Sequence, residues 1–246
     1  MLPLCLSVLL AAAPEPAVRL RASTVETEDT VELEVAGLAA PAHAKAGLYL
    51  FGRLATPAYS VRALLLRSTD GGAHWAEVLP EEEHSEVLFV EFARCEGRAL
   101  VGWSTEGPGE LTLYASADCG ATWKRQGTLP KAVWSEWPVA MSWTSGQQGT
   151  VWLQDMNEDK PLPRVLTTRD GGRSWNAVKN PLPAQPPAQS AESRLVATGS
   201  SGVRWKLTAD AQAARVERHE QSASVHTVAL LPRFWRREGN KLVPAR

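Results

Sequence analysis

The stretch Ser68-Thr69-Asp70-Gly71-Gly72-Ala73-His74-Trp75 returns twice more in this chain in slightly altered form. The second copy is Ser116-Ala117-Asp118-Cys119-Gly120-Ala121-Thr122-Trp123, and the third is Thr168-Arg169-Asp170-Gly171-Gly172-Arg173-Ser174-Trp175. A worn fourth copy, 208–215, keeps the hydroxyl and the Asp but lacks the Gly and the Trp. The Asp residues of successive copies are 48, 52 and 40 positions apart, and a turn that recurs at this period predicts a repeat architecture.

Each residue type in the repeated turn has a physical reason. Asp and Ser or Thr side chains bond nearby backbone N–H groups and hold a tight turn. The Gly permits a positive φ, and the Trp can pack back onto the adjoining strands. We therefore expect these positions to be structural rather than catalytic. They are Ser68, Asp70, Gly72, Trp75, Ser116, Asp118, Gly120, Trp123, Thr168, Asp170, Gly172 and Trp175.

Short apolar or alternating segments between the turns predict strands. The second repeat offers 86–92, 99–103 and 111–115 before its turn and a short strand after it. About four short strands per unit are typical of a propeller blade. The fourth unit is one strand short in this interpretation. The leftover segments 225–231 and 241–243 are candidates for pairing with the N-terminal strands to close a ring.

The three good copies resemble the Asp-box, also called the BNR repeat, of bacterial sialidases and related propellers. The resemblance covers about residues 30–220, with the repeated turn of each unit carrying it. It implies an all-β fold, a β-propeller of about four to five blades built from four-stranded antiparallel units with Asp-box turns. In the family these turns lie on the outer rim, so function is expected at the opposite ends of the strands that they join.

The N-terminus predicts export. In residues 1–13 an apolar run ends in three Ala residues, as in a secretory signal peptide, although no Lys or Arg precedes it. We expect a flexible segment over 14–28 and a single propeller domain over 29–246. The protein is then secreted or periplasmic. It has no stable membrane insertion, because the apolar run is too short to span a bilayer.

Composition and motifs argue against several classes of function. The formal net charge of −1, without a basic stripe, does not favour nucleic-acid binding. There is no phosphate-binding glycine loop, Gly-x-Ser-x-Gly elbow or His-Glu-x-x-His motif. The segment 155–159 begins like a calcium loop but lacks its Gly and distal Glu. We expect no cofactor and no metal.

Cys95 and Cys119 lie within one repeat. In an exported chain such a pair suggests a disulfide, and two independent buried thiols are the alternative. The two cysteines are too few for a structural zinc site, and no His stands at ligand spacing from them along the sequence.

Ten Trp residues are an unusual aromatic content for this length. Those of the repeated turns are expected in the core. Four others are candidates for stacking against a ligand, with core packing as the alternative. These four are Trp134, Trp137, Trp143 and Trp152.

Two functions remain open. The first is a non-catalytic propeller that binds a protein or a glycan in an assembly or recognition role. The second is a small sialidase-like exo-glycosidase. The family resemblance implies that such an enzyme needs three arginines, a Tyr–Glu pair and an Asp, and a Phe/Tyr-Arg-Ile-Pro motif that this sequence lacks. Three arginines converging on one pocket beside a Tyr–Glu pair would favour the enzyme.

Overall fold

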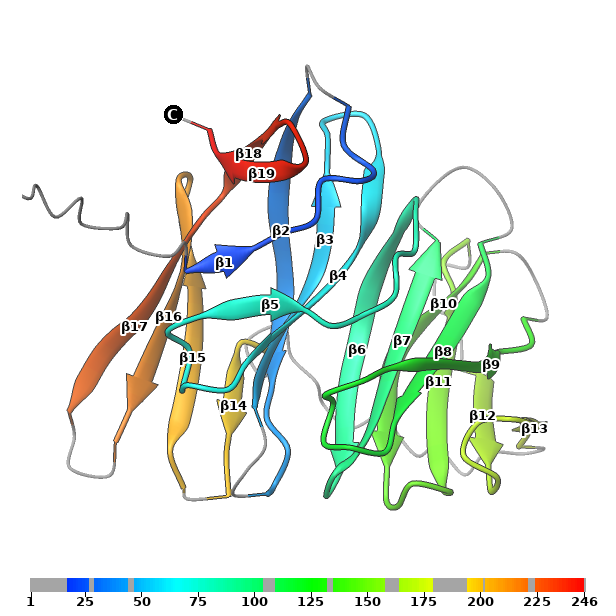
Figure 1. Ribbon diagram of the computed structural model, residues 1–246. Coiled ribbons are helices and arrows are strands. Elements are labelled where there is room, and N and C mark those ends of the chain that lie inside the picture. The colour runs from blue at the N-terminus through cyan, green and yellow to red at the C-terminus, as the bar shows by residue number, and fades with distance from the viewer. Residues whose placement is uncertain are drawn as a thin grey trace, which may run out of the picture.

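The computed structural model describes residues 17–26, 29–43, 47–103, 109–131, 135–157, 164–178, 194–200, 202–220 and 224–245. All named elements in these ranges are strands, and they form four sheets, which we label A to D in the order in which their main strands occur (Figure 1). None of these residues belongs to a helix long and apolar enough to cross a membrane. The expected all-β fold with four-stranded antiparallel sheets is confirmed.

Sheet A has the strand order β1-β5-β4-β3-β2-β18-β19, and sheets B, C and D each have four strands in chain order. The strands of sheet A are β1 Val18–Arg19, β2 Thr30–Ala39, β3 Leu48–Ala55, β4 Ser60–Ser68, β5 Trp75–Glu77, β18 Phe234–Glu238 and β19 Lys241–Pro244. Those of sheet B are β6 Ser85–Ala93, β7 Glu96–Trp103, β8 Leu111–Ser116 and β9 Lys124–Thr128. Those of sheet C are β10 Glu136–Trp143, β11 Gly149–Asp155, β12 Arg164–Thr168 and β13 Asn176–Ala177. Those of sheet D are β14 Val196–Thr198, β15 Arg204–Ala209, β16 Ala213–His219 and β17 Val225–Pro232.

The sheets pack face to face in the order D, A, B, C. Strand β4 shows why, because its side chains alternate between two apolar clusters. Leu64 and Leu66 pack with residues of sheet D, whereas Ala63 and Leu65 pack with residues of sheet B. A third cluster joins sheet B to sheet C. Sheets A and B are therefore buried on both faces, and the arrangement is consistent with a propeller-like fold.

The three repeated turns share one hydrogen-bond pattern. In the first turn the Gly72 backbone N–H donates to Ser68 Oγ at 2.8 Å, and the His74 N–H donates to Asp70 Oδ1 at 2.9 Å. The second and third turns repeat both bonds with the equivalent residues. The turns join β4 to β5, β8 to β9 and β12 to β13, which are the third and fourth strands in the antiparallel series of each sheet.

Each turn also packs on the sheet that precedes its own in the order D, A, B, C. A Cβ added to Gly72 would meet Val228 of sheet D, and one added to Gly120 would meet Tyr49 of sheet A. One added to Gly172 would meet Leu113 of sheet B. These glycines have φ of 107°, 80° and 93°, so a side chain is disfavoured there by conformation as well as by space. The repeated turn therefore fastens a sheet to its neighbour as well as closing a hairpin.

The worn fourth copy occupies a different place. Its Asp210 accepts N–H bonds from Gln212 and Ala213 in the link between β15 and β16, the second and third strands of sheet D. It is therefore not the structural equivalent of the other three turns. Sheet D opens the packing order, and among the described residues no core cluster joins it to sheet C.

Two expectations about the chain ends need correction. The segment 225–231 does not pair with the N-terminal strands, because it lies within β17 and completes sheet D. The last residues do pair with them, through β18, which is antiparallel to β2. The expected flexible segment over 14–28 is wrong for residues 17–26, because β1 pairs with β5 and Val18 and Leu20 are buried. The expected signal peptide, 1–13, lies outside the described residues.

A buried ion pair holds the N-terminal segment in place. The side chain of Arg62 on β4 is fully buried and donates to Glu77 Oε1 at 2.6 Å. The same guanidinium donates to Thr24 Oγ1 at 2.8 Å and to the Arg21 backbone oxygen at 2.7 Å. Arg21 in turn donates from its Nε to Glu77 Oε2 at 2.9 Å. Residues 21–24 therefore supply acceptors that a buried guanidinium needs.

The carboxylates of the repeated turns make the folding stability depend on pH. Burial raises the pKa of Asp118, but hydrogen bonds from the Thr122 side chain and backbone and from Ser116 outweigh it and lower the pKa to about 2. Burial likewise raises the pKa of Asp70, and bonds from His74 and Ser68 outweigh it and lower the pKa to about 2. A carboxylate with a lowered pKa in the folded state stabilises the fold fully at pH values above its unfolded-state pKa of about 3.9. This stabilisation is lost as the pH falls toward the folded-state pKa.

We therefore expect the free energy of unfolding to fall between pH 5 and pH 2. The double variant Asp70→Asn and Asp118→Asn should be less stable at pH 5 and should lose less on acidification. Urea unfolding at both pH values measures this difference. Equal acid losses in the two proteins would contradict a role of these carboxylates.

Candidate functional site

A cavity of about 390 Å³ lies where strands of sheet B begin and end, away from the repeated turns. Strand β7 ends at Trp103, and β8 runs from Leu111 to the turn that starts at Ser116. Residues near Trp103 and Leu111 are thus at the strand ends opposite the turn, where function was expected. The described residues that line the cavity are Glu82, Ser85, Val101, Trp103, Glu110, Thr112 and Arg125.

Glu82 forms the less exposed side of this cavity. It lies between β5 and β6, where its backbone oxygen accepts the Ala63 N–H at 3.0 Å and the Ser85 hydroxyl at 2.6 Å. The hydroxyl of Tyr114, a buried residue of β8, donates to Glu82 Oε1. Burial raises the pKa of Glu82, Arg125 opposes this shift, and Glu110 adds to it. Glu82 is therefore protonated at a higher pH than an ordinary glutamate.

Glu110 and Arg125 form the exposed side of the cavity. The Arg125 guanidinium lies 3.2 Å from Glu110 Oε2, and both side chains are more than half exposed, at 57% and 70%. An exposed pair of this kind contributes at most about 1 kcal/mol to stability, so both groups remain available for a ligand. The cavity thus presents two carboxyl groups and one guanidinium to solvent.

Trp103, which lines the cavity, is the first of a row of exposed aromatic rings. Trp103 is 44% exposed and Tyr59, in the β3–β4 link, is 40% exposed. His84 lies between them, with ring centroids 6.0 Å from Tyr59 and 6.4 Å from Trp103. The Trp103 indole N–H donates to the Glu83 backbone oxygen at 3.1 Å, which fixes the ring. His84 has φ of 53°, a conformation that non-glycine residues seldom adopt and that occurs preferentially at functional sites.

This combination suits a ligand with both a flat apolar face and many hydroxyl groups. An exposed indole held by a hydrogen bond provides a rigid stacking surface at little entropic cost. Carboxylates accept hydrogen bonds from hydroxyl groups, and a guanidinium donates to their oxygens. Burial raises the pKa of Glu82, which is the direction of shift that a general acid requires.

A second cavity, of about 240 Å³, lies among the inner strands β2, β6 and β14. It is lined mainly by apolar side chains, with Phe51, Phe89 and Arg194 among them. The Arg194 guanidinium carbon lies 4.5 Å from the Phe89 ring centroid, and burial lowers its pKa. It is the weaker candidate because the Arg194 guanidinium already stacks on Phe89 and because the cavity is smaller than the one beside Trp103.

Of the four tryptophans expected to stack against a ligand, the structure describes Trp137, Trp143 and Trp152, and none of these three is exposed. Trp143 and Trp152 are buried, with 7% and 8% exposure, so they belong to the core and the stacking prediction is wrong for them. Trp137 packs against the core between sheets B and C. Trp134 lies outside the described residues. The exposed ring is Trp103, which sequence analysis did not single out although it ends a predicted strand.

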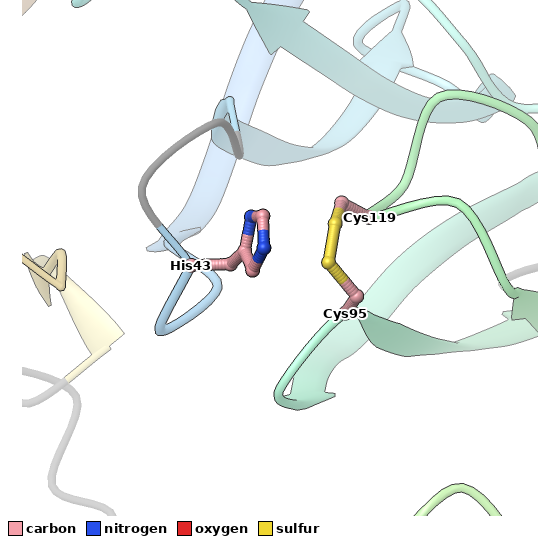
Figure 2. A group of neighbouring side chains, drawn as sticks. All are labelled: His43, Cys95 and Cys119. Carbon is pink, nitrogen blue, oxygen red and sulfur yellow. A yellow bond between two sulfur atoms is a disulfide. The ribbon is translucent and has the colours of Figure 1, made fainter.

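Cys95 and Cys119 are joined by a disulfide, and His43 lies beside it (Figure 2). The sequence suggested a disulfide or two separate thiols for this pair, without any nearby His. His43 was missed because it comes from the segment after β2, far away along the chain. Sequence spacing carried no signal for this neighbour.

Comparison with known proteins leaves the family open. No protein-family model matches the chain, and no curated protein matches it. Among solved structures, a GH74 enzyme of Niastella koreensis is similar with a TM-score of 0.39 and 16% identity, over 78% of this chain and 30% of that one. An α-L-arabinofuranosidase of Fusarium graminearum is similar with a TM-score of 0.38 and 13% identity, over 82% of this chain and 71% of that one. An α-L-arabinanase of Penicillium chrysogenum is similar with a TM-score of 0.40 and 12% identity, over 85% of this chain and 70% of that one. At these TM-scores the likenesses carry no argument about function.

Proposed function

We propose that the protein is a secreted or periplasmic, non-catalytic recognition module that binds a glycan at the cavity beside Trp103. The observation that carries this proposal is the exposed, hydrogen-bonded Trp103 ring next to Glu82, Glu110 and Arg125. A pyranose can lay its C–H face on the indole while its hydroxyl groups reach the charged side chains. A protein partner would use the same exposed rings, and is the outcome to consider if no glycan binds.

We also propose that the four sheets are four blades of a propeller and that the repeated turns are Asp-boxes. The packing order D, A, B, C and the glycine contacts of each turn with the preceding sheet support this interpretation. The binding cavity then lies at the rim of one blade, at the end opposite its Asp-box. In this proposal the ligand binds on the surface of one blade.

A small exo-glycosidase is the second candidate, because Tyr114 and Glu82 form a hydrogen-bonded pair beside a second carboxylate. Two features oppose it. Tyr114 is buried with 1% exposure, so its oxygen is poorly placed for attack on a sugar. Among the described residues that line the cavity, Arg125 is the one arginine, whereas the family resemblance implies three.

The test is a glycan array probed with the wild-type protein and with Trp103→Ala. We expect the wild type to bind a defined set of glycans and the variant to bind them about 30-fold more weakly. This ratio corresponds to the ~2 kcal/mol typical of a central aromatic contact. Titration calorimetry on the best glycan gives the ratio of dissociation constants.

Phe234→Ala is the matched control, because Phe234 is a similarly exposed aromatic residue, at 39%, on the separate strand β18. It should leave the affinity unchanged. Equal losses in both variants, or no glycan binding by the wild type, would count against the proposed site. Turnover of fluorogenic glycosides that disappears in Glu82→Gln would favour the enzyme instead.

A further inference from the structure

Three potential metal ligands meet at the junction of sheets A and B. Figure 2 shows the His43 imidazole facing the Cys95–Cys119 disulfide. One ligand atom from each of these residues lies within 4.8 Å of the other two. They come from three separate segments: His43 follows β2, Cys95 precedes β7, and Cys119 belongs to the second repeated turn. Such a convergence is fixed by the packing of the sheets and not by local sequence.

Cys119 stands where the other two turns have a glycine. Gly71 and Gly171 have φ of 75° and 79°, and Cys119 has φ of 55°. Arg94, next to Cys95, has φ of 62°. Left-handed backbone is unfavourable for a side chain, so a cysteine here needs a compensating interaction. The disulfide is one such interaction, but it does not require a histidine beside it.

The donor set has the chemistry of a thiophilic cation site. Two thiolates and one imidazole are the protein ligands of catalytic-type zinc sites, in which the fourth position stays open. Soft thiolates also select Cu⁺ over harder cations. All three residues are partly or fully exposed, so a cation can reach them from solvent. The disulfide and the metal site exclude each other, because the same sulfur atoms serve both.

We propose that His43, Cys95 and Cys119 form a redox-gated site for Zn²⁺ or Cu⁺. A dithiol reductant supplies two electrons and two protons, is itself oxidised to a disulfide, and breaks the S–S bond into two thiols. Cation binding then releases two protons as both sulfur atoms coordinate. In the reverse step a disulfide oxidant takes the two electrons from the two thiolates and, with two protons, becomes a dithiol, so that the Cys95–Cys119 bond forms again and the cation is released. This inference is independent of the glycan proposal.

The experiment titrates Zn²⁺ into the full chain, oxidised and reduced, against a chromophoric chelator. We expect one equivalent to bind the reduced protein and none to bind the oxidised protein. His43→Ala should weaken binding by about tenfold or more, since even groups that only orient a metal ligand are worth about 10–100-fold. Substitution of both cysteines by Ser should abolish binding. The same titration with Cu⁺ distinguishes the two cations.

His226→Ala is the control, because His226 is exposed on β17 of sheet D. It should bind Zn²⁺ as the wild type does. Equal affinity of His43→Ala and wild type, or no tight binding by the reduced chain, overturns the proposal. If reduction alone unfolds the protein, Zn²⁺ should restore the circular dichroism of the wild type but not of His43→Ala. Failure to restore it contradicts the site equally.

Discussion

Replacing Glu77 with Ala is expected to lower the free energy of unfolding by about 3–5 kcal/mol, the usual effect of breaking a buried ion pair. The Arg62 side chain has no exposed surface, and Glu77 is its carboxylate partner at 2.6 Å. Without Glu77 the guanidinium keeps only neutral acceptors from the N-terminal segment. Its charge is then buried and unpaired, which is far more costly than the loss of a surface contact.

Urea unfolding of the wild type and the variant measures this loss. Glu238→Ala is the matched control, because it removes a carboxylate from the Arg236 pair, in which both side chains are 54% exposed. That change should cost at most about 1 kcal/mol. Glu77→Ala should also loosen residues 17–26, so that trypsin cuts after Arg19 or Arg21. A loss no greater than that of the control would show that the buried pair does not anchor the segment.

Trp75→Ala should destabilise the protein by about 3–5 kcal/mol, as is typical for a buried Trp. Trp75 is 2% exposed and packs in the cluster that joins sheets A and D. Its indole N–H donates to the Gly72 backbone oxygen at 2.7 Å, so the variant loses both the packing and the lock on the turn. For a chain of this size the melting temperature should fall by about 6–20 °C.

Trp175→Ala is the internal comparison, since it changes the same position of the third turn. Trp175 is only partly buried, and its indole nitrogen has no partner within the described residues. The loss of stability should therefore be clearly smaller than for Trp75. Differential scanning calorimetry ranks the two variants. Equal losses would mean that the motif, rather than the burial of each ring, determines the contribution.

The repeated turns were predictable from the sequence because their hydrogen bonds are local. Ser68 and Asp70 bond N–H groups no more than four residues away, so the motif alone specifies the conformation. The strands that flank the turns followed from the same repeats. The contacts of Gly72, Gly120 and Gly172 with the preceding sheet could not be predicted, because they depend on how whole sheets stack.

Residues 17–26 and strand β17 were mispredicted, because the strand partners of both segments were not recognised in the sequence. Residues 17–26 look polar and flexible, yet the strand partner of β1 is β5 and the acceptors for Arg62 come from this segment. Strand β17 was taken as a leftover, because the fourth unit was interpreted as one strand short and 225–231 was not assigned to it. Pairing between distant segments outweighed local composition for β1, whereas β17 pairs with β16, the strand directly before it in the chain.

The sequence predicted the region of the candidate site but not the residues that form it. The strand ends opposite the repeated turns were the right region, but composition drew attention to Trp143 and Trp152, which are buried. Exposure of Trp103 depends on its position as the last residue of β7, at the edge of the cavity. Tyr114 donates a hydrogen bond to Glu82, which lies 32 positions earlier in the chain, and no sequence motif predicts this contact.

The most direct test of the glycan proposal is a crystal structure with the best-binding oligosaccharide. We predict a sugar ring stacked on Trp103, with hydroxyl groups within hydrogen-bond distance of Glu82 or Glu110. A ligand held instead in the second cavity, beside Phe89 and Arg194, with the Trp103 ring uncovered, would contradict the account.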